Sequence, residues 1–279
     1  MLKQRVITAL ILLALLLGAL FGLAAPMFAV FAGAVILLGF REWAALSALG
    51  RGGTAVYLAG VSVLMVVAFE ALGFSRAQVH EDLVSLVLLG TCQWWILALL
   101  CVWGYPASAA LWGSKAVRAL MGVLVLLPPW IAISWLVSLE TGRWLVVLTI
   151  LTVACADTGA YFCGRALGRH KLAPRVSPGK TLEGMAGGVL LALIVVPAVV
   201  AFSAGQRHLW PQWAVVVLVT VLAAVLGDLL ESMVKRHRGV KDSGNILPGH
   251  GGLLDRVDSL TAALPVFSLM YLLLIHLRT

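Results

Sequence analysis

Apolar residues fill most of this chain in runs that are long enough to cross a lipid bilayer. A transmembrane helix needs about 20 consecutive, mainly apolar residues. The runs cover residues 6–24, 27–46, 54–73, 83–103, 117–139, 143–163, 184–204, 211–231 and 257–277. The pattern predicts an all-α, polytopic integral membrane protein, built as a helical bundle of about nine transmembrane helices.

The first two runs are separated only by Ala25 and Pro26, so they are expected to form a tight helical hairpin unless one of them is tilted or incomplete. The first run follows a short basic start, as in a signal peptide, but no small-residue cleavage site closes it. We therefore interpret residues 6–24 as a retained span.

Composition supports the membrane class. The mean hydropathy is +1.04 and only 11% of residues are charged, whereas soluble globular chains carry about 25% charged residues. The four cysteines all lie within predicted spans and show no CxxC spacing. They therefore indicate small buried apolar residues, with neither a disulfide framework nor a metal site.

Basic residues are distributed asymmetrically over the predicted connections. With nine spans, the N-terminus and the second, fourth, sixth and eighth connections share one side, which holds 16 of the 20 Lys and Arg residues. Since Lys and Arg accumulate in cytoplasmic loops, this side and the N-terminus are predicted to be cytoplasmic. The two richest loops are residues 164–183 and 232–256, with five Lys or Arg each.

The simplest role for such charges is contact with anionic lipid headgroups, worth about 1 kcal/mol each. We favour that role for four residues outside the two rich loops: Arg41, Arg51, Lys115 and Arg118. It does not suffice for the two rich loops, because their glycines, prolines and acids are placed too specifically.

Acidic residues differ in their depth. Four lie near span ends or in short connections and are expected to be solvated: Glu42, Glu81, Asp82 and Glu140. Asp157 lies within the sixth run, in VACADTGAYFCGR. The small residues around it allow close helix packing, but an acid at that depth still needs a cation or a hydrogen-bond donor.

The end of the eighth run carries polar residues spaced to share one face of a continuing helix. They are Asp228, Glu231, Ser232 and Lys235. Asp255 and Asp258 repeat the three-residue spacing where the ninth run begins, so two helices offer facing carboxylate pairs. Converging carboxylates repel each other unless a cation neutralises them, and Mg²⁺ prefers such oxygen ligands together with substrate phosphates.

A simpler explanation is that acids in the first turn of a helix interact with its dipole, worth roughly 0.3–1 kcal/mol each. That explanation suits Asp258 taken alone. It does not suit Asp228 and Glu231, which lie at the C-terminal end of their run, where negative charge is disfavoured.

A glycine-rich basic loop joins the two acidic pairs. Its glycines are Gly239, Gly244, Gly249, Gly251 and Gly252. Glycines let backbone amides approach a ligand closely, and Lys235, Arg236, Lys241 and Arg256 lie alongside, so the loop predicts a polyphosphate ligand. His250, which follows Pro248 and Gly249, is open between an ordinary turn residue and a contact to phosphate or protons.

The earlier rich loop contains SPGKTLEG, residues 177–184, just before the seventh run. Ser177, Lys180 and Thr181 there are suited to bind an anion, because helix N-termini attract negative charge. The segment is not a Walker A loop, since the GxxxxGK[ST] spacing is absent.

At these positions the chain closely resembles the phosphatidate cytidylyltransferases, also called CDP-diacylglycerol synthases. The family pattern is carried here by Ser232, Lys235, Arg236, Lys241, Asp242, His250, Gly251, Gly252, Asp255, Arg256 and Asp258. The resemblance extends to DTGAY around Asp157 and to SPGKTLEG, and it covers the N-terminal half only generically. Gly179 departs from the family pattern, which more often has a second Lys at that position.

The resemblance implies Mg²⁺-dependent transfer of CMP from CTP to phosphatidate, which yields CDP-diacylglycerol and pyrophosphate in phospholipid biosynthesis. Asp228 and Asp255 would be the first metal ligands, Asp258 a third ligand or the partner of a second cation, and Asp157 a contributor to the same site. Lys235 would belong to the catalytic set with these four acids. Substrate contacts would come from Ser177, Lys180, Thr181, Lys235, Arg236, Lys241, His250 and Arg256.

The resemblance sets the expected partners, and the lack of chemical groups in the N-terminal spans sets the expected organisation. CTP, phosphatidate and membrane lipid are the expected partners, with no nucleic acid, and the expected location is the bacterial inner membrane with a cytoplasm-facing site. Residues 1–140 would form a scaffold that walls the site or contacts a second copy of the chain, and residues 141–279 the catalytic region. Two alternatives stay open: a CTP-dependent lipid kinase, since a metal and phosphate cage does not dictate which phosphorus is attacked, and a cation-coupled transporter, for which internal repeats would be expected.

Overall fold

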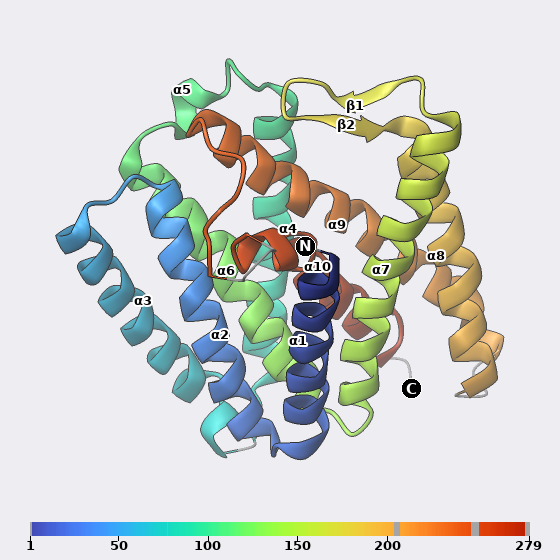
Figure 1. Cartoon of the computed structure of the whole chain (residues 1–279). Helices are drawn as coiled ribbons and strands as arrows, with labels where there is room; N and C mark the ends of the chain where they lie inside the picture. The colour runs from blue at the N-terminus through green and yellow to red at the C-terminus, as the bar shows by residue number, and fades with distance from the viewer. Residues whose placement is uncertain (1, 77, 204–206, 247–250, 277–279) are drawn as a thin grey trace.

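Figure 1 shows the computed structural model of the chain, which describes residues 2–76, 78–203, 207–246 and 251–276, without the side chains of residues 2–7, 9, 203 and 207. The α-helices are α1 (Leu2–Gly22), α2 (Ala25–Leu46), α3 (Arg51–Ala71), α4 (Glu81–Trp103), α5 (Ala109–Trp112), α6 (Lys115–Ser138), α7 (Gly142–Leu167), α8 (Leu182–Ser203), α9 (Trp210–His237) and α10 (Leu254–Leu274). Two 3-10 turns, η1 (Phe74–Arg76) and η2 (Arg207–Leu209), and two strands, β1 (Lys171–Ala173) and β2 (Ser177–Thr181), complete the described part.

The predicted class, a polytopic helical membrane protein, is confirmed. In the described ranges, eight helices are long and apolar enough to span a bilayer: α2, α3, α4, α6, α7, α8, α9 and α10. The remaining predicted run, residues 6–24, falls on α1, whose apolar portion within those ranges, Leu10–Gly22, is shorter than a span. The predicted break is present, because α1 ends at Gly22 and Pro26 occupies the first turn of α2, where its missing N–H costs nothing.

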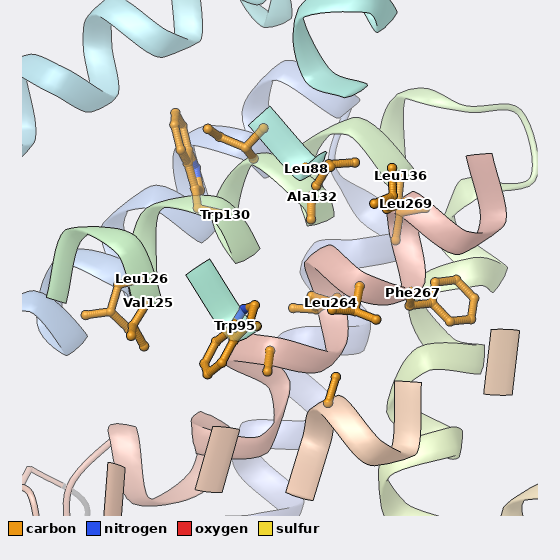
Figure 2. Packing of buried hydrophobic residues seen from close by; sticks show 14 of the residues in the cluster. Leu88, Trp95, Val125, Leu126, Trp130, Ala132, Leu136, Leu264, Phe267 and Leu269 are labelled. Atoms are coloured by element: carbon orange, nitrogen blue, oxygen red, sulfur yellow. The ribbon is translucent and has the colours of Figure 1, made fainter. Parts of the chain in front are cut away.

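Helices α6 and α10 form the centre of the bundle. They are the most buried of the eight spanning helices, whereas α3 is the least buried. In Figure 2, Trp130 and Leu136 of α6 lie near Leu88 of α4, and Leu264 and Phe267 lie on α10. The prolines within α6 and α10 are tolerated because neighbouring helices in a membrane protein satisfy or cover the freed backbone groups.

Contacts join the predicted cytoplasmic connections at one end of the molecule, toward the top of Figure 1. Arg118 at the start of α6 donates to the carbonyl of Ser47 in the α2–α3 turn. Trp112 of α5 packs on His237 at the end of α9, with ring centroids 4.8 Å apart. Arg236 Nε donates to the carbonyl of Val176 between the two strands, at 3.3 Å. The connections that the charge pattern assigned to one side therefore meet.

The predicted loops differ from the structure at two points. Residues 164–183 are not a simple loop, because α7 continues to Leu167 and β1 and β2 then pair antiparallel, with Lys171 opposite Thr181. The small sheet departs from the predicted all-α structure. Helix α9 continues to His237, so the loop predicted from residue 232 begins only after the helix ends.

Candidate active site

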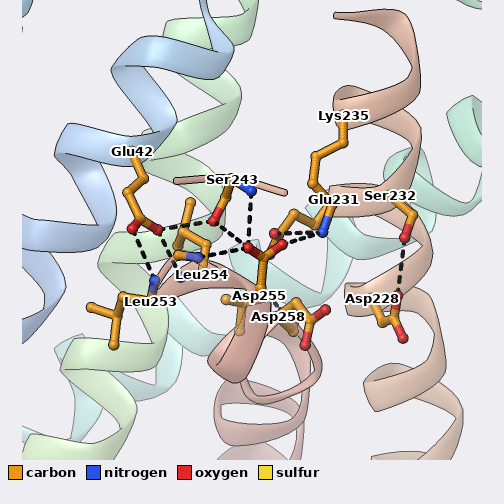
Figure 3. A network of polar contacts seen from close by, with 12 residues as sticks. Glu42, Asp228, Glu231, Ser232, Lys235, Ser243, Leu253, Leu254, Asp255 and Asp258 are labelled. Carbon is orange, nitrogen blue, oxygen red and sulfur yellow. Dashed lines mark hydrogen bonds and ion pairs between the residues drawn. The ribbon is translucent and has the colours of Figure 1, made fainter. Parts of the chain in front are cut away.

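The facing acidic pairs predicted for the eighth and ninth runs come together where α9 packs on α10 (Figure 3). The helices approach closely at Gly227, where an added Cβ would lie 2.6 Å from the carbonyl oxygen of Asp258. Because α9 continues past residue 231, the shared face that the spacing required is present: Ser232 Oγ donates to Asp228 Oδ1 and Lys235 pairs with Glu231, each one turn apart. The two helices thus present their acids to one another.

Lys235 joins the two helices electrostatically. Its Nζ lies 2.6 Å from Asp255 Oδ1 on α10 and 3.1 Å from Glu231 Oε1 on its own helix. Lys235 is 7% exposed, so its ammonium is largely occupied by carboxylates. Removing one partner of such a buried ion pair strongly destabilises a protein, because the other charge is left buried without compensation.

A second group of charges lies around Asp228. Lys180 Nζ on β2 lies 2.6 Å from Asp228 Oδ2. Asp258 interacts electrostatically with Asp228, Lys235 and Lys180, and Asp157 interacts with Lys180 and Asp228. The structure therefore brings three predicted catalytic acids into one field, with Lys180 as the cation between two helices and the hairpin.

Glycines place Asp157 in this group by drawing α7 against α8. A Cβ on Gly159 would lie 2.5 Å from the carbonyl oxygen of Gly187, and Cβ atoms on Gly187 and Gly188 would collide with Cys163 and Ala156. Small residues of this kind let helix backbones approach in membranes. The close packing expected around DTGAY is present, and it turns Asp157 toward the space that α8 and α9 enclose.

A cavity of about 410 Å³ lies beside Asp157, between α7, α8, α9 and the hairpin. Its polar lining includes Asp157, Arg165, Lys180 and Thr181, and much of the remainder is apolar, from residues such as Met185 and Val221. A mostly apolar pocket with a few converging charges is typical of a ligand site. Its two cations, beside acids, suit a ligand that carries phosphate.

Arg165 was not among the predicted site residues. It was counted only as one of the basic residues of the loop 164–183. It lies on α7, and its guanidinium donates to the hydroxyl of Tyr161, at 3.0 Å. Asp157, Tyr161 and Arg165 are spaced by four residues and so share one face of the helix. This four-residue spacing could have identified Arg165 from the sequence, but only if the helix was predicted to continue past residue 163.

Some residues of the hairpin and of the start of α8 line the cavity, and others hold the hairpin in place. Thr181 Oγ1 accepts from the backbone N–H of Gly184 at 3.1 Å, so it caps the N-terminus of α8. Glu183 accepts from the backbone amides of Arg169 and His170, and it bonds to the ring of His170 at 2.6 Å. These contacts fix the strand that carries Lys180. Ser177 begins β2 and lies opposite Ala173.

Glu42 was expected to be solvated, and that prediction is wrong. Its side chain is 4% exposed, and its carboxylate accepts from the backbone amides of Leu253 and Leu254 and from Ser243 Oγ (Figure 3). The reason is tertiary: α2 packs beside the start of α10, whose first amides need acceptors. Glu42 is thus a site residue that the sequence pattern missed.

The described part of the glycine-rich loop contacts carboxylates of the protein. Cβ atoms on Gly244 and Gly252 would lie 2.7 Å and 2.6 Å from oxygens of Glu42. The amides of Ser243 and Gly252 donate to Asp255 Oδ2, at 2.9 Å and 2.8 Å. The amides of Ser243 and Gly252 therefore bind a carboxylate of the protein, and the polyphosphate contact of the loop stays a prediction.

Arg118, expected at the lipid headgroups, is buried, with 4% of its surface exposed. Its guanidinium donates to the carbonyls of Gly113 and Ser47. Carbonyls at helix ends lack partners within their helix. Hydrogen bonds from the buried guanidinium to two such carbonyls therefore stabilise the protein more than contact with lipid headgroups would.

The whole-chain comparison decides the family. The model of the family described as "Cytidylyltransferase family" matches residues 3–274. The chain belongs to the cytidylyltransferase family. It is similar to a protein named phosphatidate cytidylyltransferase from Pseudomonas aeruginosa, with 44% identity over 96% of both chains. It is also similar to one of that name from Haemophilus influenzae, with 40% identity over 97% of this chain and 99% of the relative.

A cytidylyltransferase from Staphylococcus haemolyticus, again named for phosphatidate, is 46% identical over 132 residues, which is 46% of this chain and 49% of the relative. The similarity to the two relatives above runs through both halves of the chain. It covers nearly the whole chain, so the N-terminal helices are included as well as α7 to α10.

The acids of this cytidylyltransferase offer Mg²⁺ a partial set of oxygen ligands. Across the described ranges, no three Asp, Glu, His or Cys side chains form a group that could hold a metal by themselves. Mg²⁺ usually needs only one or two carboxylates, with the other ligands supplied by water and substrate phosphates. Asp228 and Asp258, which repel one another electrostatically, fit that smaller requirement. Asp255 is bound to Lys235 and to the amides of Ser243 and Gly252, and it shares the hydroxyl of Ser243 with Glu42.

The remaining predicted contacts lie around the same end. Lys241 is exposed in the loop after α9, and Arg256 is exposed in the first turn of α10. His250, with Pro248 and Gly249, lies outside the described residues, so its role stays a prediction. The substrate contacts and the metal ligands of this cytidylyltransferase likewise stay predictions.

Proposed function

We propose that this chain is a phosphatidate cytidylyltransferase, which transfers CMP from CTP to phosphatidate and releases pyrophosphate. The observation that carries the proposal is the similarity to two relatives of that name over nearly their whole length. The cavity between α7, α8, α9 and the hairpin supports it, because it brings Asp157, Arg165 and Lys180 to a largely apolar pocket. No observation favours a lipid kinase or a transporter.

The substrates set the place of the site in the membrane. Phosphatidate keeps its acyl chains in lipid while CTP comes from water, so both must meet at a polar cavity near one interface. The excess of Lys and Arg on the connections that surround the hairpin supports a cytoplasmic interface. We place the protein in the inner membrane, as expected for a bacterial enzyme of phospholipid synthesis, with its site open to the cytoplasm.

Arg165 and Lys180 are assigned to the substrate phosphates because both line the cavity. Lys180 is 28% exposed at its side chain, so it can exchange its contact with Asp228 for a phosphate oxygen. Arg236 has its Nε on the hairpin carbonyl of Val176, so we assign it to holding the hairpin, with its remaining donors toward substrate. Lys241 and Arg256 are exposed beside this end and would meet the outer phosphates of CTP.

Mg²⁺ is assigned to Asp228 and Asp258, with Asp157 as a further oxygen donor for the same ion or for a second cation. The ion would supply charge neutralisation at the phosphates during transfer. The electrostatic repulsion between Asp228 and Asp258 supports this assignment. Asp255, predicted as a ligand, is reassigned to holding Lys235, its partner at 2.6 Å.

The reaction needs positioning more than it needs a base. A phosphate oxygen of phosphatidate attacks the α-phosphorus of CTP, a new P–O bond forms, and the bond to the bridging oxygen breaks as pyrophosphate leaves with its electron pair. The nucleophile is already ionised, so no protein group has to remove a proton. Arg165 and Lys180 would orient the two anions and reduce their repulsion, which supplies most of the barrier lowering in phosphoryl transfer.

The outer helices are assigned to lipid and to a second copy of the chain. Within α3, only Val61 and Met65 are buried, and α4 exposes large apolar side chains such as Leu86 and Ile96. These faces need an apolar environment. Cross-linking of the protein in membranes would show whether a homodimer covers part of them.

The proposed function is tested with purified protein in liposomes that contain phosphatidate. CTP labelled at the α-phosphorus should transfer label to lipid, and γ-labelled CTP should release labelled pyrophosphate, in both cases only with Mg²⁺ present. Transfer of the γ-label to lipid would instead identify a kinase.

A further inference from the structure

Glu42 is a buried acid that joins the N-terminal helices to the catalytic helices. It lies near the C-terminal end of α2 and is 4% exposed. Its Oε1 accepts from the backbone N–H of Leu253 at 2.9 Å, and its Oε2 accepts from Leu254 N–H at 2.8 Å and from Ser243 Oγ at 3.0 Å. Every one of these partners is more than 200 residues away along the chain.

Helix α10 depends on this carboxylate because it has no cap of its own. Its N-cap residue is Leu253, which makes no side-chain capping hydrogen bond. The first amides of a helix have no partner within the helix, and they attract negative charge. Glu42 therefore does for α10 what a serine or aspartate at the N-cap does for other helices.

The contacts of Glu42 lead to Asp255 through one shared residue. Ser243 Oγ lies 3.0 Å from Glu42 Oε2 and 3.1 Å from Asp255 Oδ2. A hydroxyl has a single proton to donate, so it bonds one of the two carboxylates at a time. When it bonds Glu42, the backbone N–H of Ser243 still donates to Asp255 Oδ2, at 2.9 Å. Asp255 Oδ1 then holds Lys235 at 2.6 Å. Glu42 is thus connected to the α9–α10 face without lining the cavity.

Two glycines of the loop make room for the Glu42 carboxylate. The three atoms nearest to a Cβ on Gly244 all belong to Glu42, with Oε1 at 2.7 Å. A Cβ on Gly252 would lie 2.6 Å from Glu42 Oε2 and would collide with Ser243 Oγ. Glycine is required at these positions by the close approach of an acid from α2.

We propose that Glu42 is a positioning residue for cytidylyl transfer: from α2 it fixes the start of α10 and the loop residue Ser243, and thereby the orientation of Asp255 and Lys235. This role rests on the proposed function. It assigns to the N-terminal half a part in catalysis beyond walling the site.

The test is Glu42→Gln in the full-length protein in liposomes. The amide keeps one acceptor oxygen but turns an NH₂ donor toward amides that also donate, so at least one hydrogen bond is lost. We expect kcat to fall by about tenfold or more while the KM for CTP changes by less than about threefold. Hydrogen exchange at residues 252–254 should become faster. A purely structural role would lower the melting temperature and leave kcat per folded molecule unchanged.

Glu70→Gln is the matched control. Glu70 lies at the C-terminal end of α3 as Glu42 does in α2, but its carboxylate is exposed and bonds Ser75 at 2.8 Å. We expect wild-type kcat and wild-type exchange at residues 252–254 in this variant. A fall in kcat in Glu70→Gln equal to the fall in Glu42→Gln would contradict a specific role for Glu42.

Gly244→Ala is the second variant, because it leaves Glu42 in place and displaces its carboxylate. The φ angle of Gly244 is not in the left-handed region, so alanine adds no backbone strain there, and the three atoms nearest to the new methyl group all belong to Glu42. We expect the same fall in kcat as in Glu42→Gln. If Gly244→Ala folds and keeps wild-type kcat, the proposed role of Glu42 is overturned. This outcome is decisive even if Glu42→Gln does not fold. An inactive wild-type protein would overturn the proposed function instead, whereas unchanged exchange in Glu42→Gln would overturn the role of Glu42 alone.

Discussion

The ammonium of Lys180 lies 2.6 Å from Oδ2 of Asp228, so an ion pair joins the hairpin between α7 and α8 to helix α9. The pair lies at the edge of the cavity that Lys180 lines. An ion pair that is partly exposed contributes little to stability, about 0–1 kcal/mol. Its position beside a substrate cavity therefore points to function more than to folding.

We predict that Lys180→Met lowers kcat/KM by about 100-fold, because a cation on phosphate in a poorly hydrated site contributes about 1.5–3 kcal/mol. The melting temperature in detergent should change little. Lys171→Met, on the neighbouring strand and exposed, is the control and should keep wild-type activity. Equal kinetics in both variants would remove Lys180 from the site.

Asp228→Asn should abolish measurable transfer and weaken divalent cation binding. The variant removes one of the two carboxylates assigned to Mg²⁺, and it also leaves Lys180 without its partner. Activity against Mg²⁺ concentration and the electron paramagnetic resonance of bound Mn²⁺ measure the two effects separately. Asp82→Asn in the exposed first turn of α4 should behave as wild type. Unchanged Mn²⁺ binding in Asp228→Asn would refute the metal assignment.

The sequence predicted the acidic face of α9 and α10 because helical spacing alone puts such residues on one side. Asp228 with Ser232 and Glu231 with Lys235 are contacts one turn apart, and such contacts follow from local periodicity. The glycines beside Asp157 predicted close packing of its helix against a neighbour, again from residues that are close along the chain. Features set by neighbours along the chain were therefore accessible without a structure.

Glu42 and Arg118 were not accessible in this way. The partner Ser243 of Glu42 lies 201 residues away, and the carbonyl partner Ser47 of Arg118 lies 71 residues away. Near the end of an apolar run, a charged residue that meets water and one that meets the end of another helix have the same local pattern. Only the packing of α2 beside α10 and of α6 beside the α2–α3 turn distinguishes them.

Arg165→Gln tests the cavity residue that the sequence pattern missed. Loss of the guanidinium should raise the KM for one of the two anionic substrates by about tenfold or more, since a charged hydrogen bond to phosphate is lost. Separate titrations of CTP and of phosphatidate in mixed micelles identify which one. Arg175→Gln, in the exposed turn between the strands, should leave both KM values unchanged. No change in either KM for Arg165→Gln would remove it from the cavity's ligand set.

Arg118→Met should destabilise the protein without a specific kinetic effect. The variant leaves the carbonyls of Gly113 and Ser47 without their buried donor, at a cost of about 1–3 kcal/mol for each charged hydrogen bond. A lower melting temperature in detergent, with normal kcat in the folded fraction, is the expected result. Arg51→Met, which changes an exposed residue at the start of α3, should melt as wild type does.

Sidedness can be tested with single cysteines in a chain whose Cys92, Cys101, Cys155 and Cys163 have been replaced. Arg175→Cys lies in the hairpin turn, and Gln78→Cys lies between η1 and α4, near the opposite ends of the spanning helices. Because basic connections stay in the cytoplasm, a membrane-impermeant maleimide should label position 78 in intact spheroplasts and position 175 only after the membrane is opened. The reverse pattern would place the cavity on the outer face, out of reach of cytoplasmic CTP, and would contradict the proposed orientation.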